Sequence, residues 1–162
     1  MSEPALPDWR DCPRPQPLRI AGRYAALEPL RDAAHGEALF AASSVVDARA
    51  RFRYLFDEPP VDRAAMAAWI DARAGGVDPL FFAVVDLASG RAQGRQALMR
   101  IVPEHGVIEI GHIYWSPAIA RSRVATEAQF LFARHVFRDL GYRRYEWKCD
   151  ALNAPSRAAA LR

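Results

Sequence analysis

An apolar run followed by a long amphipathic pattern constrains the fold of this chain most. The run Val107–Trp115 (VIEIGHIYW) is apolar on both faces except for Glu109 and His112, which is typical of a strand with neighbours on both sides. After the connector SPAIARSR, a helical stripe begins and continues to Gly141. Its members are Val124, Ala128, Leu131, Phe132, His135 and Val136. A central strand leading directly into a helix predicts an α/β fold.

The rest of the sequence predicts further strands and helices around this segment. The other predicted strands are Arg19–Leu30, Leu80–Leu87, Gln93–Val102 and Tyr142–Cys149. The other predicted helices are Arg31–Ala42, Val61–Ala74 and Ala154–Arg162. A polar, arginine-bearing link spans Asp47–Pro60, and Ala88-Ser89-Gly90 makes a hairpin turn. The predicted order is therefore β-α-α-β-β-β-α-β-α, built on a mixed sheet.

The N-terminal segment differs from the rest in composition. Residues 1–18 hold five of the twelve prolines and no apolar periodicity, so we expect an extended arm at 1–18 and one domain at 19–162. Cys12 in the arm and Cys149 in a predicted strand are expected to be free thiols. The proline-rich, acidic start and the lack of an apolar run near ~20 residues predict a cytoplasmic protein that does not enter the membrane.

The charge pattern does not favour binding to a macromolecular polyanion such as a nucleic acid. The net charge of +3 comes from 22 basic and 19 acidic residues, and every basic residue except Lys148 is arginine. Arginine holds phosphate through paired donors, but a GC-rich coding sequence also produces this bias, and both explanations stay open. The arginines alternate with acids and alanines, so no nucleic-acid partner is predicted. No spacing of His, Cys, Asp and Glu indicates a metal site.

The connector before the amphipathic helix is the candidate binding loop. A helix N-terminus that directly follows a central strand presents free backbone N–H groups and the positive end of the helix dipole, which together favour phosphate. Arg121, Ser122 and Arg123 add charge and a hydroxyl at this point. The alternative is a solvated helix start in which Ser122 is an ordinary N-cap.

Two longer stretches carry a family resemblance. EIGHIYWSPAIARSRVATEA resembles motif A of the GNAT acetyltransferases, particularly the RimJ/RimL-like branch, and YEWKCDALNAPSRAAALR resembles the strand and Asn-x-x-Ser helix start that follow it. The similarity covers about residues 19–162. It implies a GNAT-type, mostly antiparallel sheet and an acetyltransferase that moves an acetyl group from acetyl-CoA to a primary amine, of a protein N-terminus or a small molecule, without a metal.

The resemblance also assigns cofactor-binding positions. In the family, the loop before ATEA wraps the coenzyme A pyrophosphate with backbone N–H groups. The residues that inherit this role are Arg121, Ser122, Arg123, Val124, Ala125 and Thr126. Backbone groups of Ile113, Tyr114 and Trp115 would pair with the pantetheine arm and polarise the thioester, and Asn153 occupies the family position that contacts the cofactor.

The sequence departs from the family pattern at two places. Ala120 stands at the first position of the loop motif, and Arg123 stands where the family has a glycine that lets backbone approach phosphate. The family continues past the Asn-x-x-Ser helix into two further strands, whereas this sequence ends at Arg162. We therefore expect a fold that lacks these two strands, with an open sheet edge that favours a homodimer. The alternative function is a weak or inactive acyl-CoA-binding module.

Direct transfer requires a group that removes a proton from the amine. Glu109 is an acid in an apolar strand, where burial would raise its pKa toward the working pH, and the alternative is a structural partner for an arginine. His112 is the competing base, although it faces the other side of a regular strand unless a β-bulge intervenes. Ser156 is either a helix cap or a hydroxyl near the thiol. His135 is expected on the buried stripe, and His35 and His105 at the surface.

Overall fold

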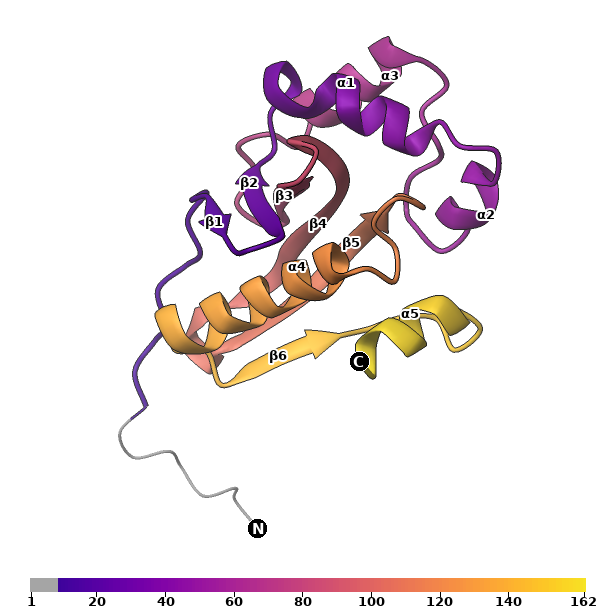
Figure 1. The fold of residues 1–162 in the computed structure, drawn as a ribbon. Helices are drawn as coiled ribbons and strands as arrows, with labels where there is room; N and C mark the ends of the chain where they lie inside the picture. The colour runs from indigo at the N-terminus through magenta and orange to yellow at the C-terminus, as the bar shows by residue number, and fades with distance from the viewer. Residues whose placement is uncertain (1–8) are drawn as a thin grey trace.

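The structure is a computed structural model that describes residues 9–162, and it contains a six-stranded sheet with helices on both faces (Figure 1). The strands are β1 (Ile20–Ala21), β2 (Ala25–Pro29), β3 (Leu80–Asp86), β4 (Arg91–Val102), β5 (Val107–Trp115) and β6 (Arg144–Trp147). The helices are α1 (Asp32–Ser43), α2 (Ala48–Phe52), α3 (Arg63–Asp71), α4 (Arg123–Arg134) and α5 (Ala154–Ala160). A 3₁₀ turn lies at Pro103–His105 and a π-helical turn at His135–Asp139.

The strands pair in their order along the chain, which explains the mixed sheet. Neighbouring strands from β1 to β5 are antiparallel, and β6 lies parallel to β5. A parallel pair needs a crossover connection, and α4 provides it. β5 thus has a partner on each side, as its apolar sequence predicts, and the expected mixed, mostly antiparallel sheet is confirmed.

The sheet separates two apolar cores whose residues alternate along the strands. Phe82 of β3 packs edge-on against Phe132 of α4, with ring centroids 5.2 Å apart. The adjacent Phe81 points to the other face and meets Trp69 of α3 at 5.4 Å. Ile70 of α3 is fully buried on that side. α4 therefore covers one face, and α1 and α3 cover the other, because successive side chains of a strand point in opposite directions (Figure 1).

Three predicted elements differ from the observed ones. The expected strand Arg19–Leu30 is a hairpin of β1 and β2, because the chain bends at Gly22, whose amide donates to the carbonyl of Ala25. The polar link contains the short helix α2. The last strand ends at Trp147, so the expectation of Cys149 in a strand is wrong, and this cysteine is exposed.

Part of the N-terminal arm is packed on the domain rather than mobile. Cys12 is buried in the core on the α4 side, and its amide donates to the carbonyl of Pro103. Trp9 packs against the same core, and its indole N–H donates to the carbonyl of Glu104 at 2.8 Å. The expectation that Cys12 lies in a mobile, non-core tail is therefore wrong, because two apolar side chains cover the turn after β4. Both cysteines are free thiols.

The predicted position of His35 is also wrong. It was expected at the surface, but it is only 3% exposed. Its Nδ1 accepts from the amide of Arg31, so Nε2 carries the proton and lies 3.0 Å from a carboxylate oxygen of Glu28. This pairing lets a histidine of the first helix sit between α1 and β2. His105 is exposed as expected. His135 is half-buried and pairs with Asp139 at 2.8 Å.

Between residues 9 and 162, no helix is both long enough and apolar enough to cross a membrane. The same residues contain no group of His, Cys, Asp and Glu placed to hold a metal ion.

Candidate active site

A β-bulge interrupts β5 next to β4. Gly111 pairs with Ala97 and Tyr114 pairs with Arg95, so two residues of β5 stand opposite one residue of β4. His112 lies in the bulge with a φ of +52°, in the left-handed region. His112 can leave the face opposite Glu109 only if a bulge interrupts the strand, and the bulge is present.

The bulge turns the His112 ring toward the face covered by α1 and α3. The ring lies 4.9 Å from that of Phe81 and 5.4 Å from that of Phe56, between centroids. Its Nδ1 is buried and has no hydrogen-bond partner among residues 9–162. Burial lowers the pKa of His112, and the positive charge of Arg95 lowers it further. The ring is therefore neutral near physiological pH, with a nitrogen lone pair available.

Glu109 points to the same face because its neighbours Ile108 and Ile110 pack toward α4. Its carboxylate is buried and accepts from Arg100 Nη1 at 2.8 Å and from Lys148 Nζ at 2.7 Å. Two cations thus hold this acid in place. This geometry favours the structural alternative for Glu109 over the role of base.

A buried network of ion pairs around Asp57 lies next to His112. Arg95 of β4 is 4% exposed, stacks on Trp69 with its Cζ 4.1 Å from the ring centroid, and donates to Asp57 at 3.1 Å. Arg73, two residues after α3, donates to the other oxygen of Asp57 at 2.7 Å. Burial raises the pKa of Asp57, but Trp69 and the two arginines lower it more, so the net direction is downward. Burial lowers the pKa of Arg95 to about 10.

Sequence reasoning missed this network. Asp57 and Arg95 stand 38 positions apart, in a loop and in a strand that no local pattern connects. Their contact ties the segment between α2 and α3 to the sheet. The residue before Asp57 is Phe56, so the network also fixes the aromatic ring that lies against His112.

The remaining predicted residues of β5 act through their packing as well as their backbone. Tyr114 is 3% exposed, and its hydroxyl donates to the carbonyl of Ala42 in α1 at 2.6 Å. Ile113 and Trp115 are half-buried and pack against the core on the α4 side. The strand end is therefore anchored on both faces of the sheet.

The connector after β5 presents unpaired amides at the N-terminus of α4. Ser122 is the N-cap, since its Oγ accepts from the amide of Val124 at 3.1 Å and its carbonyl accepts from the amide of Thr126 at 3.1 Å. The amides of Arg121, Arg123 and Ala125 donate to no acceptor within residues 9–162. Ser122 is thus a cap, as one alternative held, and free donors still remain at the positive end of the helix. These are the features that a diphosphate requires.

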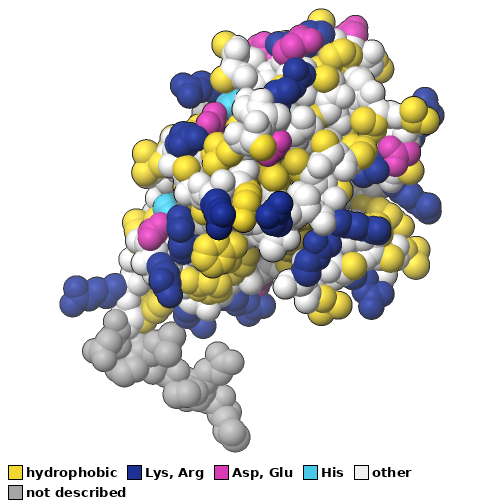
Figure 2. All heavy atoms as spheres, in the orientation of Figure 1, with side chains coloured by type: hydrophobic (Ala, Val, Ile, Leu, Met, Phe, Trp, Pro, Cys, Tyr) yellow, Lys and Arg dark blue, Asp and Glu magenta, His cyan; other side chains and the backbone are white. Residues whose placement is uncertain are grey.

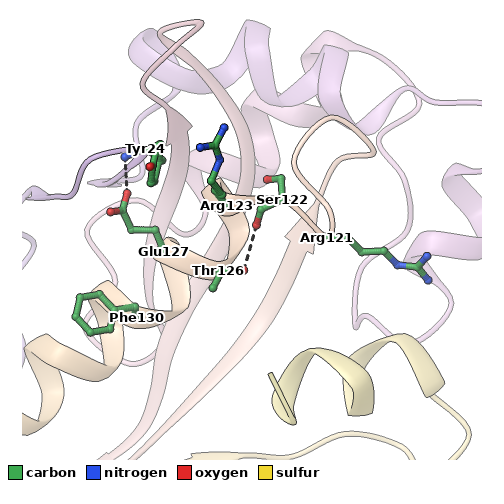
Figure 3. A pocket seen from close by; sticks show the side chains of 7 residues that line it. All are labelled: Tyr24, Arg121, Ser122, Arg123, Thr126, Glu127 and Phe130. Carbon is green, nitrogen blue, oxygen red and sulfur yellow. Dashed lines mark hydrogen bonds between the residues drawn. The ribbon is translucent and has the colours of Figure 1, made fainter.

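Two adjoining hollows lie beside this helix start, on the side of the β1–β2 hairpin. They have volumes of about 520 and 380 Å³, and Tyr24, Ser122 and Arg123 line both. The guanidinium of Arg123 lies over the Tyr24 ring at 4.9 Å. Arg121, with a φ of +62°, also lines the larger hollow, and its side chain extends toward α5 rather than toward Tyr24 (Figure 3). Figure 2 shows arginine and lysine side chains spread over the face of the molecule that carries α4.

Tyr24 and Glu127 belong to this site but were not predicted. The Glu127 carboxylate accepts from the amides of Arg23 at 2.9 Å and Ala25 at 2.7 Å, and also from that of Tyr24 (Figure 3). Burial raises the pKa of Glu127, and these three amides lower it more, so the net shift is downward. The acid of the ATEA stretch therefore fastens the hairpin to α4. Tyr24 offers no sequence signal of its own.

The segment after β6 completes the set of predicted residues. Asn153 caps α5, because its side-chain oxygen accepts from the amide of Ser156 at 3.2 Å. Ser156 is consequently not the cap. Its Oγ accepts from the indole N–H of Trp147 at 2.9 Å, which leaves the hydroxyl proton free to be donated. No hydrogen bond joins Ser156 to Glu109 or His112 in the described part of the chain.

One segment thus combines a bulged strand, a parallel neighbouring strand and a helix start with free amides. The chain belongs to the GNAT family, because the family described as "Acetyltransferase (GNAT) domain" matches residues 26–162. It is an acyltransferase of that family, whose general reaction transfers an acetyl group from acetyl-CoA to an amine. No curated protein sequence matches the chain.

Several solved structures share this fold. A GCN5-related N-acetyltransferase from Brucella melitensis is 57% identical with a TM-score of 0.94, over 96% of this chain and 71% of that one. A probable GNAT-family acetyltransferase from Chromobacterium violaceum is 37% identical with a TM-score of 0.87, over 99% of this chain and 80% of that one. RimL, a ribosomal L7/L12 alpha-N-protein acetyltransferase, is 16% identical with a TM-score of 0.71, over 89% of this chain and 78% of that one, and shows the shared fold alone.

Proposed function

We propose that this protein transfers the acetyl group of acetyl-CoA to a primary amine, of a protein N-terminus or a small molecule, by direct attack, as in the RimJ/RimL-like branch. The observation that carries the proposal is the set of unpaired amides of Arg121, Arg123 and Ala125 at the start of α4, directly after the bulged strand. These donors fit a diphosphate in number and polarity. A donor held by these amides would lie beside β5, which carries His112 in its bulge.

The protein's own groups support each proton movement in this reaction. His112, neutral and with an unpartnered Nδ1, takes the proton of the attacking amine as the new C–N bond forms. Backbone amides near Ile113–Trp115 polarise the thioester carbonyl. The C–S bond breaks, the thiolate leaves, and the free Ser156 hydroxyl donates a hydrogen bond to it. That thiol has a pKa near ~8.5 and needs little help.

Glu109 takes a positioning role in this scheme. Its carboxylate already accepts from Arg100 and Lys148, so its charge is balanced before substrate arrives. Arg100 and Lys148 engage both carboxylate oxygens, so neither oxygen is free to receive a proton from the amine. We therefore assign the proton transfer to His112 and the fixing of the β5–β6 pair to Glu109.

The acceptor approaches from the link between α1 and α3. Phe56 of this link contacts His112, and the Tyr54 hydroxyl donates to the carbonyl of Leu152, in the loop before α5, at 3.2 Å. The link thus reaches both the reactive side of β5 and the segment that carries Asn153. Its arginines Arg49, Arg51 and Arg53 favour an acceptor amine that also bears a carboxylate.

A second candidate is an acyl-CoA-binding module with little or no turnover, and Arg123 in the place of glycine favours it. The structure offers a matched pair of variants to examine this position. Arg123 is the first residue of α4, and Ser122 before it is extended, with φ −105° and ψ 173°. Proline is compatible with both conformations and removes only an amide that the helix does not use. Arg123→Pro therefore deletes the guanidinium and the amide donor, whereas Arg123→Ala deletes the guanidinium alone.

The test is isothermal titration with acetyl-CoA followed by thiol-release assays on a panel of amines. We expect Arg123→Pro to bind acetyl-CoA about tenfold more weakly than Arg123→Ala, since a hydrogen bond to a charged group is worth about 1.5–3 kcal/mol. Equal affinities of the two variants would contradict the phosphate role of this amide. Binding by the wild type without thiol release on any amine would establish the second candidate.

Four further expectations belong to this proposal and stay predictions: a cytoplasmic location, metal-free turnover, the absence of a nucleic-acid partner, and a homodimer.

A further inference from the structure

A buried arginine of β4 contacts the backbone of the bulge that carries His112. Arg95 pairs with Tyr114, directly beside the irregular register. Its guanidinium Nη1 donates to the carbonyl of His112 at 3.4 Å, and its Nη2 donates to a carboxylate oxygen of Asp57 at 3.1 Å. One planar side chain thus joins the backbone of the bulge to the segment between α2 and α3.

Further contacts fix the position of this guanidinium. Its Cζ lies 4.1 Å from the centroid of the Trp69 ring. Arg73 binds the second oxygen of Asp57 at 2.7 Å and so holds the carboxylate that Arg95 contacts. A planar guanidinium that is stacked on a ring and bonded in two directions has few conformations left. The carbonyl of His112 therefore meets a donor whose position is set before any substrate binds.

The burial of these charges indicates that stability is not their main effect. Arg95 is 4% exposed, and the side chain of Asp57 is 10% exposed. Removing two charges from water costs about as much as their attraction returns, so apolar side chains in place of a buried ion pair are often neutral or stabilising. A residue other than glycine at positive φ, by contrast, persists only where its surroundings hold it, and His112 has a φ of +52°.

We propose that Arg95, anchored by Asp57, is a positioning residue for His112, whose bulge it holds in the conformation that directs the imidazole toward the acceptor side. This inference rests on the proposed function, in which His112 takes the proton of the amine. Burial and then the positive charge of Arg95 lower the pKa of His112. Arg73 and Arg100 lower it as well, Asp57 raises it, and the net direction is downward.

The first test is Arg95→Met, which removes the donors and the charge and leaves Asp57 paired with Arg73. Its kcat at alkaline pH should fall about tenfold, because a misplaced group costs rate steeply, while the affinity for acetyl-CoA stays within about twofold. The fall in rate at acidic pH, the acid limb of the pH profile, should move to higher pH, because one cause of the lowered pKa of His112 is gone. The melting temperature should change by no more than about 4 °C.

A second variant separates geometry from charge. Arg95→Lys keeps the cation but lacks the planar fork that reaches Asp57 and the carbonyl of His112 together, so kcat should fall about three- to tenfold while the acid limb stays near its wild-type pH. The matched control is Arg63→Met, which removes another arginine–aspartate pair, that with Asp32 at 2.8 Å between α3 and α1. It should leave kcat within about twofold and the acid limb in place.

The outcomes separate this inference from the proposed function. Wild-type kcat in Arg95→Lys, or wild-type kcat and acid limb in Arg95→Met, overturns the positioning role, and Arg95→Lys decides if Arg95→Met does not fold. If folded wild type acetylates no amine, the proposed function fails, and NMR then decides this inference without turnover. The ring pKa and the Cα chemical shift of His112, assigned by comparison with His112→Gln, should both change in Arg95→Met, and identical values overturn the contact.

Discussion

His112 shows how one residue can determine the chemistry of a strand. A residue other than glycine with φ in the left-handed region costs on the order of 1–3 kcal/mol, and surrounding structure must hold it there. Here the register of β4 on one side and the rings of Phe81 and Phe56 on the other supply that constraint. The result is an imidazole on the acceptor side with an unpartnered nitrogen.

Replacing His112 with glutamine should lower kcat about a hundredfold, the usual contribution of a positioned base, while the affinity for acetyl-CoA stays within about twofold. The wild-type rate should fall as pH drops through the pKa of His112, which lies below its ordinary 6.5. The test is to measure the rate of both proteins as a function of pH. If the fall in rate at acidic pH is absent in His112→Gln, that fall is due to protonation of the His112 ring.

The control for this assignment is Glu109→Gln, which keeps the shape of the buried side chain and removes its charge. The acid limb should persist in that variant. If the acid limb is absent in Glu109→Gln but present in His112→Gln, then Glu109 rather than His112 is the base.

At the scale of elements, the Glu127 carboxylate of α4 binds three amides of the β1–β2 hairpin. Glu127→Gln should lower the free energy of unfolding by about 1–2 kcal/mol at neutral pH, because three amides lose a charged acceptor. The pKa of Glu127 is lowered in the folded protein, so its stabilisation is present above the unfolded value of 4.5 and is lost as pH falls through the folded pKa. Urea unfolding of both proteins should show this difference in the free energy of unfolding at neutral pH and no difference at acidic pH. Glu58→Gln, at an exposed acid, is the control that should change little at either pH.

Two buried tyrosines provide a second test of how elements are connected. The Tyr114 hydroxyl donates to the carbonyl of Ala42 and links β5 to α1, whereas the Tyr145 hydroxyl in β6 has no partner within residues 9–162. Tyr114→Phe should cost about 1–2 kcal/mol, since a buried carbonyl loses its donor. Tyr145→Phe should be neutral or slightly stabilising, because it removes a buried polar group without a partner. Equal losses in thermal unfolding would refute the assigned contact.

On the scale of the whole molecule, the N-terminal segment is part of the packed structure. Trp9 and Cys12 cover the turn after β4 and continue the core that lies between α4 and the sheet. This segment closes a surface that the hairpin and α4 leave open. The expected extended arm therefore contributes to the domain at least from Trp9 onward.

Thiol labelling tests this packing. Exposed Cys149 should react with a disulfide reagent at once, whereas Cys12 should react only on unfolding, because it is 9% exposed and burial and Asp11 raise its pKa. Native protein should thus release one equivalent rapidly and a second in denaturant. Cys149→Ala should abolish the rapid phase and Cys12→Ala the slow one. Two rapid equivalents would mean that the segment opens readily in solution.

Local patterns determined most of the architecture. The bounds of β5, the course of α4 and the β3–β4 hairpin follow from apolar periodicity and turn residues, which act over a few positions. The helix start at Arg121, Ser122 and Arg123 was identified for the same reason, since free amides result from a helix that begins directly after a strand. The family resemblance extended this loop to Thr126. Ser122 as a cap belongs to this class as well.

Tertiary contacts decided what the site can do. The bulge at His112 depends on the register with β4, and the Asp57–Arg95 contact depends on a loop folding onto a strand 38 positions later. Glu127 meets the hairpin more than a hundred positions away, and Glu109 acquires its two cations from β4 and from the residue after β6. None of these contacts produces a periodic pattern in the sequence, because each depends on how distant segments pack in three dimensions.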